Sequence, residues 1–318
     1  MTTTTRVLAR HAAPFVICLL GATAATAQPA GTTRLIVQIG VSPSGEATSE
    51  WLAVLRKRLS AGAYDSVAAI RKSLSMEETA WASLVEARVP AWTYMVAPLA
   101  ALYHPVASPE QIHIILGNRG GEDAFTHDER TIGFDLAALQ ANYGGALEDG
   151  NADRLDRFFR HEVSHLLQKA WLATHPWDDR SPLGMALADI WAEGLGNYYS
   201  LSSRWVEGNG RLTARAMRTR AELEPRFTSR LVALACIDHE AAGPLLAGLS
   251  SGPFDKKWGA VPAALWLAAE PGPADSALRR FIVAGPAGVW DLADRHLPRS
   301  SSAALHDARA AGARCRRR

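Results

Sequence analysis

The chain has 318 residues and carries 34 Lys and Arg against 32 Asp and Glu, so its net charge is close to zero. Residues 28–298 hold 26 basic against 31 acidic residues. Because this body is mildly acidic, it lacks the basic surface that nucleic-acid binding requires, and we exclude a nucleic-acid partner.

The first 27 residues have the three-part pattern of a secretory signal peptide. Arg6 and Arg10 precede an apolar stretch at 12–22, and an A-x-A cleavage sequence follows at 25–27. The apolar stretch is too short to span a bilayer, and no later run is longer, so we expect no stable membrane insertion. We therefore expect cleavage after residue 27 and export to the periplasm or the medium, with an uncleaved anchor as the alternative.

The pattern of apolar residues predicts an α+β fold. An N-terminal part, residues 28–172, mixes strands with helices, and prolines at positions 90, 98 and 105 are expected to break the chain. A second part, residues 173–298, is mainly helical. The strands are predicted at 34–42, 112–116 and 131–136, and the helices at 50–59, 64–74, 77–88, 155–172, 181–199, 212–223, 227–237, 241–249, 258–269, 275–284 and 290–296.

The C-terminal residues 299–318 contain six Arg and one Asp among Ala and Ser, with no apolar period, and we expect a disordered basic tail. Only Cys236 and Cys315 remain after removal of the signal peptide. A disulfide between them is possible in an oxidising compartment, but Cys236 lies in an apolar run, which favours a free core cysteine.

An HExxH sequence lies in the predicted helix 155–172, for which Asp153 is the expected N-cap. Residues four apart lie one above the other on a helix, so His161 and His165 can direct two imidazoles at one ion. Catalytic zinc sites take three protein ligands and leave a position for water. Glu162 is placed to act as a base on that water. The alternative is an amphipathic helix whose histidines bind water or backbone groups.

The third ligand is expected from the helix 181–199, which has Ser181 as N-cap and Pro182 at its first position. Glu193 lies near the middle of this helix. Asp189 and Asn197 are one turn away on either side, where they are candidates to accept the proton of a liganding histidine. Gly194 and Gly196 in the helix interior indicate that another backbone passes close by.

Other assignments of these acids and histidines stay open. Glu193 is alternatively a surface glutamate. His175 is the main alternative to Glu193 as third ligand, because a metzincin site uses a third histidine. The glycine-containing continuation HExxHxxGxxH of such a site is absent, which argues against this alternative. The competing third ligands are His175, Asp178, Asp179 and Asp189.

These two segments together resemble the gluzincin zinc metallopeptidases. The resemblance covers about 45 residues and implies a zincin-like fold, one Zn²⁺ ion, His161, His165 and Glu193 as ligands, and Glu162 as general base. The 28 positions between His165 and Glu193 exceed the spacing in thermolysin and the aminopeptidases, and Asn197 stands where thermolysin-like enzymes have an aspartate.

The expected function is therefore that of an exported zinc peptidase acting on peptides or proteins. An edge strand beside the cleft would pair with an extended substrate, and Gly120 and Gly121 would either give this rim mobility or form an ordinary turn. The alternatives are a zinc hydrolase of another amide or ester, and an inactive secreted binding protein. The candidate oxyanion donors are Tyr198, Tyr199 and His239.

Overall fold

A small mixed sheet forms the N-terminal part of the computed structural model, which describes residues 33–315. Its strands are β1 (Arg34–Ile39), β2 (Gln111–Gly117), β3 (Ala124–Thr126) and β4 (Thr131–Asp135), in the order β1-β2-β4-β3. β1, β2 and β4 are parallel, and β3 is an antiparallel edge strand. The α+β class is confirmed. The sequence analysis missed β3, which is only three residues long. The predicted signal peptide lies outside the described residues.

The helices around this sheet include one much longer than expected. They are α1 (Ser49–Arg58), α2 (Ala61–Ala68), α3 (Met76–Leu102) and α4 (Leu136–Tyr143). α3 starts at a capping box between Ser75 and Glu78 and continues through Pro90 and Pro98, so the predicted breaks at these prolines are wrong. An interior proline costs a helix about 3 kcal/mol. The fully buried side chains of Trp81 and Trp92 offset that cost through apolar burial.

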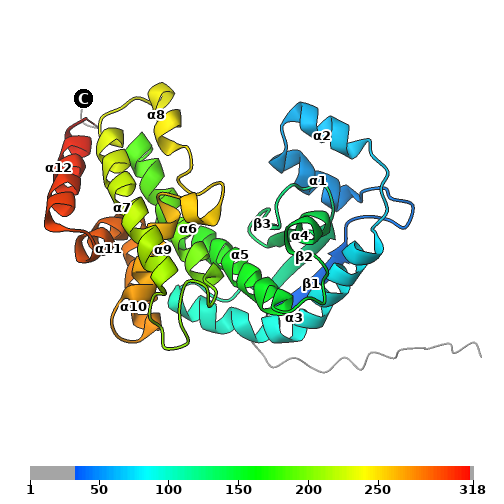
Figure 1. Ribbon diagram of the computed structural model, residues 1–318. Helices are drawn as coiled ribbons and strands as arrows, with labels where there is room; N and C mark the ends of the chain where they lie inside the picture. The colour runs from blue at the N-terminus through cyan, green and yellow to red at the C-terminus, as the bar shows by residue number, and fades with distance from the viewer. Residues whose placement is uncertain (1–32, 316–318) are drawn as a thin grey trace, which may run out of the picture. The chain divides into compact units, whose positions relative to one another are not determined.

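The remainder of the chain is helical (Figure 1). α7 continues through Pro225 and joins two helices that were predicted as separate. The elements are α5 (Asn151–Thr174), α6 (Pro182–Ser200), α7 (Ala214–Leu234), α8 (His239–Leu246), η1 (Phe254–Lys256), α9 (Ala260–Ala269), α10 (Ala274–Ala284), η2 (Gly285–Ala287), α11 (Gly288–His296) and α12 (Arg299–Cys315).

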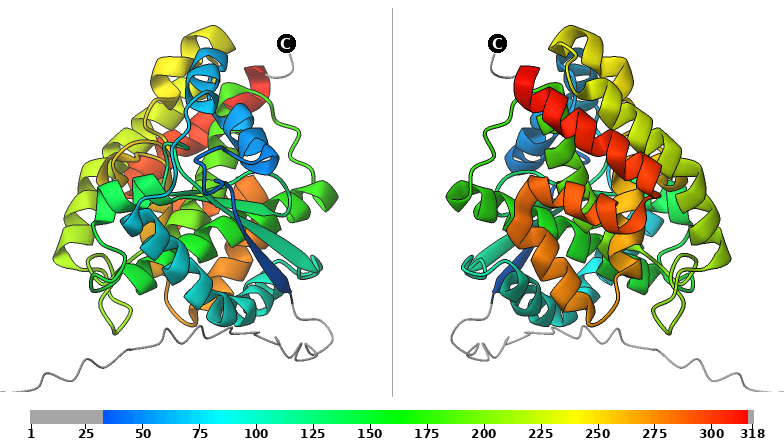
Figure 2. Two further views of the ribbon diagram at one scale, coloured as in Figure 1. Left: turned by 90° about the vertical axis from the view of Figure 1, so that its right-hand side faces the viewer. Right: turned by 90° about the vertical axis from the view of Figure 1, so that its left-hand side faces the viewer.

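α12 replaces the predicted disordered tail, so that prediction is wrong for residues 299–315. The helix, red in Figure 2, packs on α7 and α11 and buries Leu305 and Ala308. Cys315 forms a disulfide with Cys236 just beyond α7, and Cys236 is therefore not a free core cysteine. The apolar stripe of α12 is narrow and built partly of alanine, which is why the periodicity analysis missed it.

The main hydrophobic core extends from the sheet through α3, α5, α6 and α9. The two parts predicted from the sequence therefore meet along packed helices, and α5 and α6 lie between them (Figure 1). No helix within residues 33–315 is both long enough and apolar enough to cross a lipid bilayer.

Candidate metal centre

α5 and α6 approach each other closely at the candidate ligands. α5 begins at Asn151 with Gly150 as its N-cap, three residues before the predicted cap Asp153. A Cβ atom on Gly196 would lie 2.6 Å from Nε2 of His161, so only glycine lets α6 pass the imidazole at this distance. Gly194 instead faces α9, where an added Cβ would lie 2.8 Å from Cβ of Ala263. Both glycines mark close contacts, as predicted, but only Gly196 faces α5.

Three side chains converge on one point between α5 and α6. Nε2 of His161 lies 3.6 Å from Oε2 of Glu193, and Nε2 of His165 lies 3.5 Å from Oε1. The potential ligand atoms of all three residues lie within 4.8 Å of one another. Within residues 33–315 the competing third ligands His175, Asp178, Asp179 and Asp189 belong to no such cluster.

Gln168 sets the orientation of His165. Its Nε2 donates to the carbonyl oxygen of Ala192 at 3.0 Å, so its Oε1 faces His165 and accepts from Nδ1 at 2.8 Å. Nδ1 therefore carries the proton, and the lone pair of Nε2 in neutral His165 points toward Glu193. Nδ1 of His161 lies 2.9 Å from Oγ of Ser200, a contact that holds the orientation of the second imidazole.

Asp189 and Asn197 are not the partners of the two imidazoles, contrary to the prediction. Asn197 Nδ2 donates to the backbone oxygen of Glu193 at 2.8 Å, and Asp189 Oδ2 accepts from Oγ of Ser250 at 3.0 Å. The partners are Gln168 and Ser200. A signal for Gln168 exists in the sequence, because it follows His165 by three residues on one helix.

The cluster favours a positive charge at its centre. Burial alone would raise the pKa of Glu193, but interactions with His161 and His165 outweigh burial and lower the pKa to about 2. Burial also disfavours the charged form of His161, yet the carboxylates of Glu193 and Glu162 raise the pKa of His161 above its ordinary value. The site therefore favours a positive charge between Glu193 and the two imidazoles, which either a proton on His161 or a metal cation would supply.

Two separations between these atoms match those between zinc ligands. Zinc bonds of about 2.1 Å in a tetrahedron place the ligand atoms about 3.4 Å apart. The 3.5 Å and 3.6 Å separations between the imidazole nitrogens and the Glu193 oxygens agree with this value. Two histidines and one carboxylate are a donor set that catalytic zinc sites use.

Glu162 lies beside the cluster and is held by the edge strand of the sheet. Its side chain is buried, with 6% exposure, and its Oε2 accepts from Oγ1 of Thr126 at 2.8 Å. Thr126 is the last residue of β3, and the sequence analysis missed it. No local pattern links two residues 36 positions apart, so only the packing of β3 against α5 places them together.

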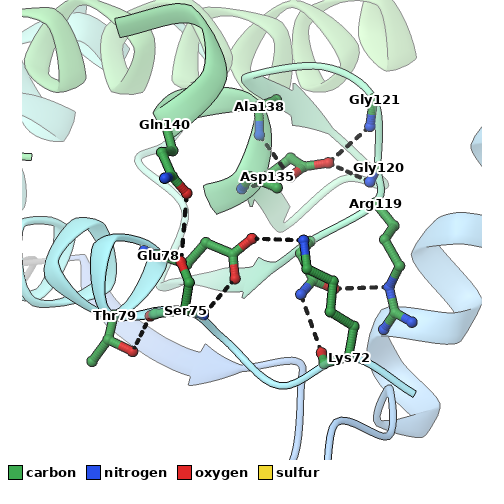
Figure 3. Close-up of polar contacts among 12 residues, drawn as sticks. Lys72, Ser75, Glu78, Thr79, Arg119, Gly120, Gly121, Asp135, Ala138 and Gln140 are labelled. Carbon is green, nitrogen blue, oxygen red and sulfur yellow. Dashed lines mark hydrogen bonds and ion pairs between the residues drawn. The ribbon is translucent and has the colours of Figure 1, made fainter. Parts of the chain in front are cut away.

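The loop that leads into β3 is fixed by a buried carboxylate. Asp135 accepts the backbone N–H groups of Gly120 and Gly121 with one oxygen and those of Ala137 and Ala138 with the other (Figure 3). These bonds favour the ordinary turn over the mobile rim at Gly120 and Gly121, because both backbone N–H groups have a partner.

The three candidate oxyanion donors make no hydrogen bond or ion pair with the ligand residues among the described contacts. Tyr198 and Tyr199 line a separate cavity of about 430 Å³ together with Arg160 and Glu270, and His239 is exposed at the start of α8. Burial raises the pKa of both tyrosine hydroxyls, and the charge of Asp275 raises it further.

A different residue, Lys257, acts electrostatically on the candidate metal centre. Burial acts to raise the pKa of the Glu193 and Asp189 carboxyl groups, and the charge of Lys257 opposes that effect at both. Lys257 also acts on His161. It lies just before α9, and nothing in the local sequence marks it as part of the site.

Comparisons with models of protein families, with curated proteins and with solved structures found no match. A functional inference for this chain therefore depends on the residues and geometry described above.

Proposed function

We propose that the protein is an exported zinc-dependent peptidase of the gluzincin type that hydrolyses peptide bonds. The observation that carries the proposal is the convergence of His161, His165 and Glu193 on one point with the buried Glu162 beside it. The Cys236–Cys315 disulfide supports export, because structural disulfides persist mainly in oxidising compartments.

His161, His165 and Glu193 would hold the ion. A zinc ion held there would supply Lewis-acid chemistry, polarising a carbonyl group and making water more acidic. Gln168 and Ser200 keep the Nδ1 atoms of the two histidines engaged. Such partners fix the ring orientation and raise the basicity of the nitrogen that binds the metal.

Glu162 acts as the general base in this mechanism. Thr126 donates to one carboxylate oxygen of Glu162 at 2.8 Å and so fixes the direction of the side chain. The carboxylate takes a proton from the attacking water and passes it to the amine that leaves. The same hydrogen bond links the position of the base to the edge of the sheet.

The free edge of β3 favours an extended peptide as the substrate. His127 N donates to Thr131 O, and Asp135 N donates to Asp123 O, so the odd-numbered residues of this segment pair with β4. Backbone groups alternate in an antiparallel ladder, and those of Ala124 and Thr126 therefore point to the outer edge. A substrate strand that pairs there would run along the strand whose Thr126 side chain holds Glu162. This feature favours a peptide over a small amide or ester.

The test combines metal analysis with peptide cleavage. The mature chain is expected to bind one zinc ion and to cleave members of a broad peptide library. Glu162→Gln should keep the zinc and lose about 10²- to 10⁴-fold in cleavage rate, the usual contribution of a general base. Glu86→Gln, at an exposed position on α3, is the matched control and should leave both unchanged.

Two results separate the alternatives. Stoichiometric zinc without peptide cleavage by the wild type points to another amide or ester as substrate. A protein that takes up no zinc when the metal is plentiful contradicts the proposal and leaves the secreted binding protein.

A further inference from the structure

The end of β3 lies between two helices. Side chains alternate along a strand, so Phe125 and Thr126 point to opposite faces of the sheet. Phe125 contacts Trp51 of α1, with ring centroids 6.1 Å apart, and Thr126 donates to Glu162 of α5 at 2.8 Å. α1 therefore covers one face of β3, and α5, which carries the two candidate histidine ligands, covers the other (Figure 1).

Lysines from both helices hold the backbone just after β3. Lys57, in the last turn of α1, donates to the carbonyl oxygen of His127 at 2.6 Å, and Lys169 of α5 donates to that of Asp128 at 3.2 Å. Lys169 follows His165 by four residues, so it lies on the face of α5 that carries the candidate ligands. Two ammonium groups therefore meet at the end of the edge strand, one helical turn beyond His165.

Both ammonium groups have donors to spare. A lysine has three N–H donors, and Lys57 and Lys169 each use one for a backbone carbonyl. Within residues 33–315 neither of them forms an ion pair with a carboxylate. The pKa of Lys169 is lowered first by desolvation and then by the charge of Lys57, and the acids Asp128, Glu129 and Glu162 do not reverse this effect. A further negative charge between the two lysines would therefore be favourable.

Two buried polar atoms at the same end of β3 have no hydrogen-bond partner within residues 33–315. They are Nε of Arg58, whose Cζ lies 3.7 Å from the ring centroid of Phe125, and Nδ1 of His127. Glu122 pairs with Nη2 of Arg58 at 2.5 Å and does not engage Nε. Buried polar atoms nearly always have a partner. These two atoms therefore indicate that a polar group from outside the chain completes this end of the strand.

A substrate strand on β3 would reach the two lysines. The backbone groups of Ala124 and Thr126 face the outer edge, and Lys169 takes the carbonyl oxygen of Asp128, the next even-numbered residue. A peptide that pairs with Ala124 and Thr126 therefore comes to Lys169 within one or two residues. Ammonium donors at that place attract a carboxylate, because hydrogen bonds between two charged groups are the stronger kind.

We propose that Lys57 and Lys169 together bind a carboxylate of the peptide substrate, so that the enzyme prefers peptides with an acidic group near the scissile bond. The inference rests on the proposed peptidase function. The carboxylate is that of an Asp or Glu side chain or that of the peptide C-terminus, which present the same pair of oxygens. Its binding makes and breaks no covalent bond, so the two lysines act on substrate affinity and not on the chemical step.

The test uses a peptide that the wild type cleaves, made with Glu or Gln at each position in turn around the cleaved bond, and with a free or an amidated C-terminus. Glu at one position, or the free C-terminus, should lower KM at least fivefold relative to its neutral counterpart, with kcat little changed. Whichever of the two changes has this effect identifies the source of the carboxylate.

The matched variants carry the same charge change at different places. Lys57→Gln/Lys169→Gln should reduce the preference below twofold, and Lys256→Gln, at an exposed position in η1, should retain it. Lys169→Glu should favour a peptide with Lys at the selected position, which a merely structural role would not produce. Lys57 and Lys169 are both exposed, so these variants are expected to fold, and thermal unfolding checks this.

The results separate this inference from the peptidase proposal. An equal preference in Lys57→Gln/Lys169→Gln and Lys256→Gln, or no preference in the wild type, would overturn the role of the lysines while peptide cleavage stands. If no peptide is cleaved, fluorescence anisotropy measures binding of the same peptides. Tighter binding of the acidic peptide that depends on the two lysines then keeps the carboxylate site and rejects the peptidase. Equal binding of acidic and neutral peptides rejects both.

Discussion

Gln168 shows how much of the candidate site depends on single hydrogen bonds. Its amide group spans from the backbone oxygen of Ala192 on α6 to Nδ1 of His165 on α5. Since the Ala192 oxygen only accepts, the orientation of the amide is determined, and with it the tautomer of His165. The residue therefore couples the candidate ligand His165 on α5 to the helix that carries Glu193.

Replacing Gln168 with Leu should lower zinc affinity about 10- to 100-fold, because partners of this kind hold the metal-binding nitrogen in place. Competition with a chelator of known affinity measures the effect. Gln140→Leu, on α4 and remote from the ligands, is the control. Equal zinc affinities for the two variants would show that the amide does not orient His165.

At the level of single helices, buried contacts outweigh the local conformational preferences of individual residues. Proline is unfavourable inside a helix, yet α3 and α7 continue through Pro90, Pro98 and Pro225 because their apolar faces are buried on both sides of each proline. Gly196 inside α6 is also unfavourable for a helix, because glycine has a low helix propensity. Its lack of a side chain, however, allows the close approach of α5 at His161.

Gly196→Ala tests that close approach. The added Cβ would lie 2.6 Å from Nε2 of His161 and should displace the imidazole. We expect zinc affinity to fall at least about tenfold, equal to about 1.4 kcal/mol, while helix content is retained. Gly243→Ala in α8 has open space around the new methyl group and serves as control. It should leave zinc binding unchanged, and an unchanged affinity in Gly196→Ala would refute the steric argument.

At the scale of the whole molecule, the C-terminal helix is attached by both packing and a covalent bond. α12 contributes Leu305 and Ala308 to the core, and Cys315 links it to Cys236 across 79 positions. A cross-link that closes a loop of this length removes much of the conformational freedom of the unfolded chain. The link lies away from the candidate ligands in sequence and in contacts.

The double variant Cys236→Ser/Cys315→Ser should lower the free energy of unfolding by about 4 kcal/mol on the chain-entropy estimate. Urea denaturation with and without a reductant measures the loss, and reduced wild type should unfold at the same urea concentration as the variant. Zinc affinity is expected to stay the same. A variant as stable as the oxidised wild type would contradict a structural role for the bond.

The sequence by itself determined the features that depend on neighbours along one helix. The HExxH spacing places His161 and His165 on one face, and Ser181 with Pro182 starts the helix of Glu193 where predicted. These follow from helical periodicity and capping, which act over a few residues.

Only the tertiary structure decided which distant groups complete the site. Thr126 lies on β3 and Ser200 on α6, and their positions follow from how both elements pack against α5. Packing depends on the total energy of many weak contacts between residues far apart in the chain, and no short sequence pattern predicts that total. For the same reason the structure, and not the spacing, places Glu193 rather than the other acids beside His161 and His165.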